Sequence, residues 1–332
     1  MKSDAEQTEA FENLTPDKIL DAVETLGIDC DGRFLALNSY ENRVYQIGVE
    51  DDKPVVAKFY RPGRWTDEAI IEEHDFTLQL ADLEIPVVAP ILGTSGNSLF
   101  HSGFYRFALY PCKGGRSPDL DNSEHLEFLG RFIGRIHALG ASGKFQHRLT
   151  LDIENMVIKP RQYLLDVGLI PDHLMPAYES ITNDLVRQIK NCYEQAGVIN
   201  NIRIHGDCHP SNILWVDDMP HIVDFDDAKT GPAVQDIWMF LSGEREYMSA
   251  RLADFLEGYT QFYDFNPAEL HLVEALRTMR IIHYAYWIAS RWSDPAFPIA
   301  FPWFDNIRYW EDHVLSLREQ SALLNEPPLI WN

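Results

Sequence analysis

The sequence predicts an α+β protein with a small β-rich N-terminal lobe and a larger α-helical C-terminal lobe. Apolar and polar residues alternate through much of the first third of the chain, which is typical of half-buried strands. A stretch containing Pro and paired Gly follows at 110–115, and beyond it apolar residues recur every three or four positions. We therefore assign residues 1–110 to the N-terminal lobe and residues 111–332 to the C-terminal lobe.

A helix and a β-hairpin open the predicted N-terminal lobe. Thr15 is a suitable helix N-cap, because the proline that follows it fits the first helical position. Alternating apolar residues then predict strands at 45–49 and 55–59, joined by the polar turn at 50–54. Such a short connection makes the two strands antiparallel neighbours.

The remainder of this lobe is predicted to add one helix and two strands. A helix should follow Thr66, since apolar residues recur among charged ones after it. The segments 86–90 and 104–109 are rich in Val, Phe and Leu and are predicted to be strands of the same sheet. The lobe is thus expected to be an antiparallel sheet with one inserted helix.

Helices dominate the predicted C-terminal lobe. Leu126, Leu129, Ile133 and Ile136 follow the helical repeat. Long helical patterns also occur at 179–196, 246–263, 267–292 and 307–324. A strand-and-turn insertion at 203–228 interrupts them.

Composition excludes several classes of function. The 28 Lys and Arg against 51 Asp and Glu leave a net charge of −23, which disfavours a nucleic-acid binder or a polybasic membrane anchor. The 4 cysteines form no C-x-x-C pair, which argues against a zinc ribbon or a disulfide scaffold. The polar N-terminus lacks the apolar core of a signal peptide, and no apolar run reaches the ~20 residues of a membrane span. We expect a cytoplasmic protein that acts as a monomer.

The insertion at 203–228 carries the residues with the clearest chemistry. Strands at 213–216 and 221–223, folded about Asp218, would pair 213 with 223 and 214 with 222. The next pair outward would set Asn212 beside Asp224. Two such oxygen ligands suit Mg²⁺, which prefers a few protein oxygens together with phosphate and water.

Asp207 precedes Asn212 by five residues, which is the D-x-x-x-x-N spacing of a kinase catalytic loop. In that loop the aspartate accepts the proton of the substrate hydroxyl. A single aspartate in a glycine-flanked loop is more often a turn or cap residue. The combination of Asp207, Asn212 and a hairpin ending in Asp224 is much rarer, and it predicts a phosphotransferase.

These residues also carry a family resemblance. The runs I-H-G-D-C-H-P-S-N-I-L-W at 204–215 and I-V-D-F-D-D-A at 222–228 resemble the aminoglycoside-phosphotransferase and choline-kinase branch of the protein-kinase-like fold. Four further runs are similar to the bacterial stress response kinase A family. They are L-N-S-Y-E-N-R-V-Y-Q at 37–46, A-K-F-Y-R-P at 57–62, G-P-A-V-Q-D at 231–236 and R-W-S-D-P-A-F-P at 291–298. The resemblance implies a bilobal kinase-like fold and an ATP- and Mg²⁺-dependent serine/threonine protein kinase of the stress response.

The resemblance also implies roles for single residues. Asp207 would accept the proton or orient the hydroxyl, and Asn212 and Asp224 would hold Mg²⁺. Lys58 would grip the ATP phosphates from its strand, although by itself it is an ordinary half-exposed strand lysine. Glu73 would pair with that lysine.

Five further positions have less specific signals. Glu72 is a close rival of Glu73 as the lysine partner. Ser39 would contact ATP from a turn that lacks the usual glycines, unless it is a plain turn serine. Tyr110 would begin the hinge that offers backbone groups to adenine. Asp226 replaces the glycine of D-F-G and is a metal ligand, a structural ligand or only a loop acid. Asp236 would open the following helix and brace the catalytic loop, although an acidic residue at a helix start is also common without such a role.

Three functions follow as hypotheses. The first is a serine/threonine protein kinase that also phosphorylates itself. The second is a small-molecule hydroxyl kinase that uses the same residues on an amino alcohol or a sugar. The third is a nucleotide-binding scaffold without catalysis, which the presence of Asp207, Asn212, Asp224 and Lys58 disfavours.

Overall fold

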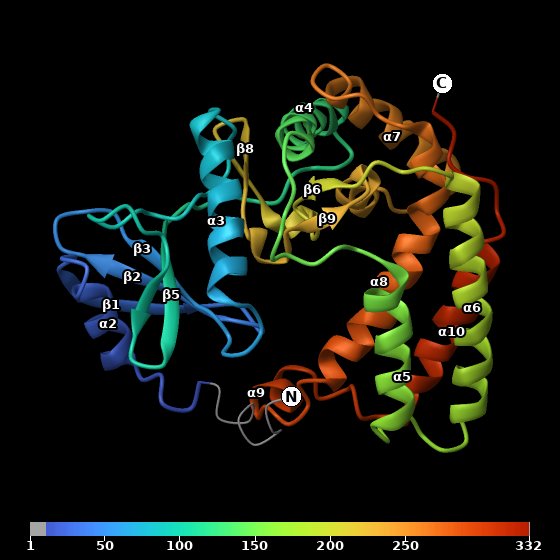
Figure 1. The fold of residues 1–332 in the computed structure, drawn as a ribbon, viewed down its shortest axis with the longest axis horizontal. Coiled ribbons are helices and arrows are strands. Elements are labelled where there is room, and N and C mark those ends of the chain that lie inside the picture. The colour runs from blue at the N-terminus through green and yellow to red at the C-terminus, as the bar shows by residue number, and fades with distance from the viewer. Residues whose placement is uncertain (1–10, 332) are drawn as a thin grey trace. The chain divides into compact units, whose positions relative to one another are not determined.

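Two compact units, each assembled from separate stretches of sequence, make up the described chain. The computed structural model describes residues 11–331. The first unit runs to Pro118 and adds Phe145–Arg148 and Ser211–Asp226. The second contains Asp119–Lys144, Leu149–Pro210 and the chain from Asp227 onward. Figure 1 colours both units along the sequence.

A five-stranded antiparallel sheet forms the centre of the first unit, in the order β1-β2-β3-β5-β4. Its strands are β1 (Cys30–Leu37), β2 (Arg43–Val49), β3 (Val55–Phe59), β4 (Phe100–Ser102) and β5 (Tyr105–Pro111). Helix α2 (Pro16–Glu24) buries Ile19 and Val23 in one core cluster with Phe59 and Phe107 of the sheet. This apolar layer fixes the sheet on which Lys58 lies.

Helix α3 (Asp67–Asp82) is the long helix of the first unit. The hydroxyl of Thr66 accepts a hydrogen bond from the backbone N–H of Ala69 at 3.2 Å, so the helix begins where the sequence predicted. The fully buried ring of Phe76 packs edge-on against Phe145 and Phe225. Helix α3 thereby joins all three chain segments of this unit.

Most of the predicted N-terminal elements are confirmed. Strands β2 and β3 form the predicted antiparallel hairpin, with Ile47 opposite Val55. The strand predicted at 86–90 was wrong, because Val87 forms only an isolated bridge to Ile222. Pro86 and Pro90 lack the N–H groups that a ladder needs. Strand β1 escaped prediction, since a bulge near its start breaks the alternation of its burial.

The second unit is mainly helical. Its helices are α4 (Ser123–Ala141), α5 (Lys159–Asp166), α6 (Met175–Ala196), α7 (Arg245–Tyr259), α8 (Val273–Ala289), α9 (Ala296–Ala300) and α10 (Ile307–Leu323). Helices α5, α6, α8 and α10 run side by side in Figure 1. Strands β6 (Ile202–Ile204) and β9 (Lys229–Gly231) pair antiparallel in the same unit, and β6 packs against α4.

The helical patterns of the sequence correspond to α4, α6, α7, α8 and α10. The pattern at 267–292 divides into a 3₁₀ segment, Pro267–Leu272, and α8. The short helix α5 was missed.

The α+β class is confirmed, and the four cysteines are free thiols. Within residues 11–331, no helix combines the length and apolar character needed to cross a membrane. Residues 1–10 contain most of the polar N-terminus that argued against a signal peptide, and they lie outside the described residues.

Candidate active site

The hairpin of β7 (Ile213–Val216) and β8 (Met219–Ile222) forms with a tighter turn than predicted. Ile213 faces Ile222 and Val216 faces Met219, so the predicted pairing of 213 with 223 was wrong by one residue. Asp217 and Asp218 form a two-residue turn with φ of 48° and 59°. Left-handed conformation at both turn positions matches the twist of a tight hairpin, and aspartate tolerates it better than most residues.

The shorter turn changes what lies at the open end of the hairpin. The carbonyl of Asn212 accepts a hydrogen bond from the N–H of Val223 at 3.0 Å, and Asp224 follows one position further along. Asp224 takes a left-handed φ of 61°, and its side chain is exposed. Asn212 and Asp224 therefore emerge from the same end of the hairpin, offset by one residue instead of directly opposite.

Lys58 lies on β3 and is brought to both acidic residues that follow the hairpin. Its Nζ is 2.8 Å from Oδ1 of Asp224 and 3.4 Å from Oδ1 of Asp226. Burial alone would lower the pKa of this lysine, but the two carboxylates outweigh burial and raise the pKa above its ordinary value. The ammonium group is thus charged and is held at the end of the hairpin.

The two neighbouring glutamates of α3 take different positions. Glu72 accepts hydrogen bonds from the N–H groups of Gln146, His147 and Arg148 at 2.5, 2.8 and 3.0 Å. Glu73 is buried on the same side of the helix as the core. Among the described residues, no ion pair within 4 Å joins Lys58 to either glutamate. Glu72 instead anchors the segment 145–148.

Burial raises the pKa of Glu73 to about 7, and the positive charges of Lys58 and Arg148 only partly oppose this rise. The carboxylates of Asp226 and Asp224 raise it further. Glu73 therefore lies within electrostatic reach of Lys58 although the two groups form no ion pair. Its protonation state changes near neutral pH.

Asp226 is a buried carboxylate with several donors around it. Its Oδ2 accepts hydrogen bonds from Nδ2 of Asn42 at 3.2 Å and from Nη1 of Arg64. Nη2 of Arg148 donates to its backbone carbonyl. These contacts favour the structural interpretation of Asp226. Sequence reasoning missed Asn42, Arg64 and Arg148, and only the position of Asn42 in the turn of Ser39 gave a signal.

Ser39 and Tyr110 lie in the expected elements. Ser39 is half-buried in the turn between β1 and β2. Tyr110 is near the end of β5, and its hydroxyl lies 3.0 Å from that of Tyr60 and 3.2 Å from Nε2 of His74. The imidazole of His74 also contacts the hydroxyl of Ser98 at 2.8 Å. The side chain of Tyr110 thus belongs to a buried polar network, which leaves only its backbone groups for a hinge.

The second unit contains Asp207 and the groups that hold it. Nη1 of Arg280 on α8 donates to Oδ1 of Asp207, and Nε2 of His209 lies 3.4 Å from its Oδ2. Burial would raise the pKa of Asp207, but His209 and Arg280 outweigh it and lower the pKa to about 2. Asp207 is therefore ionised at neutral pH.

Asp236 braces the loop of Asp207, as the sequence predicted. Its carboxylate accepts hydrogen bonds from the N–H groups of His205 at 2.7 Å and Gly206 at 2.8 Å. Nε2 of His137 lies 3.2 Å from the same carboxylate. Asp236 ends a 3₁₀ turn, Ala233–Asp236, instead of opening a helix. Two main-chain donors thus fix the direction of the loop immediately before Asp207.

The donor chemistry at the hairpin suits a hard divalent cation. Asn212 offers an amide oxygen and Asp224 an exposed carboxylate, which fits Mg²⁺ because that ion takes one or two protein ligands and fills its remaining positions with phosphate and water. Among residues 11–331, no cluster of three or more His, Cys, Asp or Glu side chains could hold a metal. Asn212 and Asp224 alone therefore provide the pair of oxygen donors that the sequence predicted for Mg²⁺.

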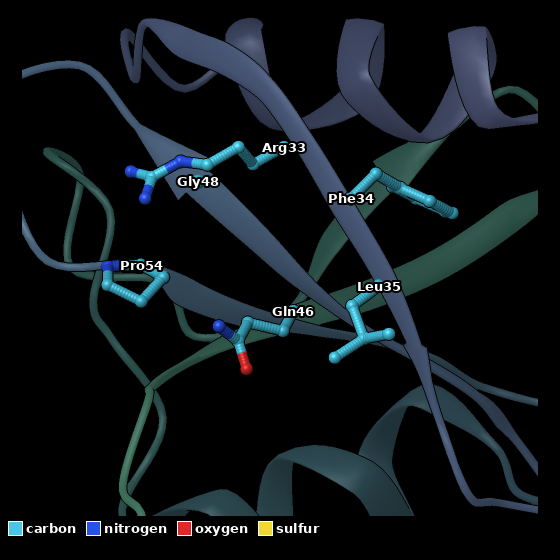
Figure 2. Close-up of a pocket in the computed structure, with 6 residues that line it drawn as sticks. All are labelled: Arg33, Phe34, Leu35, Gln46, Gly48 and Pro54. Carbon is cyan, nitrogen blue, oxygen red and sulfur yellow. The ribbon is translucent and has the colours of Figure 1, made fainter.

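The pocket in Figure 2 is separate from these residues. Its lining comes from β1, β2 and the residue just before β3: Arg33, Phe34, Leu35, Gln46, Gly48 and Pro54. It contains no acidic or nucleophilic side chain and none of the predicted site residues. We therefore assign it no part in the chemistry.

Comparisons with known proteins show which family the chain is similar to. The model of the APH family, described as "Phosphotransferase enzyme family", matches residues 33–273. The chain is 44% identical to "Stress response kinase A" of Escherichia coli strain K12, over 96% of both sequences. It is 41% identical to "Serine/threonine protein kinase RdoA" of Salmonella typhimurium strain LT2, again over 96% of both.

A solved structure supports the fold. Amicoumacin kinase hAmiN, in complex with AMP-PNP, Ca²⁺ and Ami, is similar with a TM-score of 0.73 and 17% identity over 97% of both chains. This likeness confirms the predicted kinase-like fold, and the relatives confirm the predicted family. The chain therefore belongs to the phosphotransferase enzyme family, together with the relatives named stress response kinase A.

Proposed function

We propose that this phosphotransferase is a serine/threonine protein kinase that moves the γ-phosphate of ATP, with Mg²⁺, to protein hydroxyl groups, its own included. The main observation that supports this proposal is the 2.8 Å contact between Nζ of Lys58 and Oδ1 of Asp224. It joins the residue expected to grip phosphate and the residue expected to hold the metal. The name of the Salmonella relative supports protein as the acceptor.

Asp207 has the chemistry of a residue that orients a hydroxyl. A carboxylate with a pKa of about 2 is ionised at neutral pH and accepts a hydrogen bond from the acceptor O–H. It is a weak base, so it takes the proton late. Late proton transfer suits a loose transition state in which the transferred phosphoryl group carries most of the charge.

Asn212 and Asp224 would hold Mg²⁺, which when bound neutralises charge on the nucleotide phosphates. Asp224 would then leave Lys58, and the lysine ammonium would become available to phosphate and to the carboxylate of Glu73. Ser39 would add a hydroxyl and an N–H from the turn before β2, and Tyr110 would supply backbone groups to adenine. Four free cysteines support a reducing compartment, and we place a monomeric enzyme in the cytoplasm.

The test replaces Asp207 with Asn and follows transfer from labelled ATP. We expect wild-type protein to label itself and a generic protein acceptor. The D207N variant should lose at least about 100-fold in rate while it still binds nucleotide, because the neutral amide cannot accept the hydroxyl proton. The variant Asp312→Asn, on the exposed face of α10, is the matched control.

Two results would contradict the proposal. Undiminished transfer by D207N would remove Asp207 from the mechanism. Labelling of amino alcohols or sugars, with the protein acceptors unlabelled, would favour the second candidate, a small-molecule hydroxyl kinase. The likeness to amicoumacin kinase is the observation that favours this candidate.

A further inference from the structure

Cationic side chains accompany the acidic groups at the Asp207 loop, although the whole chain carries a net charge of −23. Arg280 of α8 pairs with Asp207, and Nζ of Lys229 lies 3.8 Å from Oδ1 of Asp227. Each of these carboxylates thus has a cation of its own. The loop does not share the strongly negative character of the rest of the chain.

Arg280 has hydrogen-bonding capacity left over. Its side chain is 43% exposed, whereas that of Asp207 is 24% exposed. Within the described part of the chain, Asp207 is its one hydrogen-bond partner, through Nη1. A guanidinium carries five N–H donors in a planar fork that fits carboxylate and phosphate groups. The donors that Asp207 does not use are accessible for an incoming anion.

The same face of α8 extends this cationic environment. His283 lies three residues beyond Arg280 and therefore on the same side of the helix. Burial and the charges of Lys229, Arg291 and Arg280 lower its pKa to about 4, although Asp227 opposes the shift. His283 is thus neutral at pH 7, and the charges of three cations reach the position that it occupies. Arg291 lies over the ring of Trp287 at 5.7 Å.

We propose that Arg280 is a specificity-determining residue, which selects acceptors that carry a carboxylate or phosphate group beside the reacting hydroxyl. The inference rests on the proposed function in one respect, since both use Asp207 to orient the acceptor hydroxyl. An acceptor anion can take the unused N–H donors of Arg280 while Asp207 receives the hydroxyl. A cationic acceptor meets a like charge at the same place, which costs binding energy.

The site is thereby distinguished from one built for amino alcohols. A carboxylate without a cationic neighbour would attract a protonated amine, but the positive charge of Arg280 already balances the negative charge of Asp207. The favoured protein acceptor is a serine or threonine next to an acidic residue. A small hydroxy acid also carries a carboxylate beside a hydroxyl, so the experiment tests both peptides and a small hydroxy acid.

The experiment measures kcat/KM for a panel of acceptors. Three peptides contain one serine flanked by Glu, by Ala or by Lys, and two small acceptors are a hydroxy acid and an amino alcohol. Each is tested with wild-type protein and with Arg280→Glu and Arg280→Lys. The matched control is Arg308→Glu, which makes the same charge change on α10, where Arg308 is 86% exposed.

We expect wild type to prefer the Glu-flanked over the Lys-flanked peptide by roughly tenfold, as for a close charge pair at a binding interface. R280K should keep most of this preference, R280E should invert it, and R308E should leave it unchanged. The preference is the ratio of kcat/KM for the Glu-flanked peptide to kcat/KM for the Lys-flanked peptide, taken within each variant. A loss of rate common to all acceptors therefore cancels.

The outcomes separate the two proposals. Phosphorylation of peptides without charge preference, or an unchanged preference in R280E, would overturn the role of Arg280 and leave the protein-kinase function intact. Arg280-dependent phosphorylation of the hydroxy acid alone would keep the role of Arg280 and overturn the protein-kinase function. A panel with no phosphorylated member would contradict both.

Discussion

At the residue scale, a buried carboxylate connects three parts of the first unit. Asp226 contacts Asn42 in the turn before β2, Lys58 on β3 and Arg64 before α3. Removing a carboxylate from water costs several kcal/mol, which partners offset only while they are in place. Asp226 therefore fixes the lysine and the neighbouring turn relative to the end of the hairpin.

Replacing Asp226 with Asn should lower the free energy of unfolding by roughly 3 kcal/mol, because Lys58 and Arg64 would lose the charge they face. Urea unfolding followed by circular dichroism measures the change. The control D312N removes an exposed carboxylate 3.8 Å from Arg308 and should shift stability by less than about 0.5 kcal/mol. Equal stability of D226N and wild type would show that Asp226 is only a loop acid.

Glu73 gives the first unit a dependence on pH. Burial raises its pKa from 4.5 to about 7, so the folded chain binds this proton more tightly than the unfolded chain does. The stabilisation is complete below pH 4.5 and is lost as pH rises through about 7.

Between pH 4.5 and about pH 7, the free energy of unfolding of wild type should therefore fall relative to that of the variant Glu73→Gln, by at most about 3 kcal/mol. Urea unfolding of both proteins at pH 5, 6, 7 and 8 measures the difference. Glu269, whose pKa burial also raises to about 7, is present in both proteins and cancels in the comparison. Parallel stability curves would show that Glu73 does not titrate in this range.

Residues that follow one another at fixed spacing could be proposed from the sequence, whereas their partners could not. Asp207, Asn212 and Asp224 belong to a local pattern of loop and hairpin. Arg280 is 73 positions from Asp207, and Arg64 is 162 positions from Asp226. Nothing in the spacing of an arginine indicates which distant carboxylate it meets, because tertiary packing decides that contact.

At the element scale, the loop before Asp207 depends on a close approach between two backbone segments. Gly206 has a φ of +83°, and a Cβ at this position would collide with the carbonyl oxygen of Asp227. Its N–H donates to Asp236. The loop and the segment after the hairpin can therefore meet only where residue 206 has no side chain.

The variant Gly206→Ala should lose more than about 2 kcal/mol of stability and most phosphate transfer, because left-handed strain and the clash add together. Gly168 is the matched control, since it has a φ of +75° and a methyl group added there would meet no atom within 4 Å. Gly168→Ala should cost only the conformational strain, about 1 kcal/mol. Similar losses in the two variants, measured by urea unfolding, would remove the close approach as a cause.

Elements were predictable where local chemistry determines them. Thr15 and Thr66 mark helix starts because their hydroxyls accept from the first turn of the helix. The hairpin of β7 and β8 was placed correctly but its register was not, because Asp217-Asp218 lacks the glycine that usually signals a two-residue turn. A shift of one residue in the turn moved Asp224 one position beyond its predicted partner.

At the scale of the whole molecule, the fold class followed from periodicity and the electrostatics of the site did not. Alternating and helical patterns reflect burial along each element, so they predicted three of the five strands of the sheet and most of the long helices. Net charge is a sum over the surface, and −23 gave no indication of the cation that neutralises Asp207. The cation beside Asp207 comes from α8, which is remote from Asp207 in the sequence.

The first unit takes its polypeptide from three places, the last of which ends at Asp226. A ribosome must therefore translate about two thirds of the coding sequence before the final strand pair of this unit has been synthesised. Until then, the nascent chain contains the strands of the sheet but not the hairpin that carries Asn212 and Asp224. The lysine on β3 has no acidic partner from that hairpin during this interval, so its two ion pairs are among the later contacts that the growing chain can acquire.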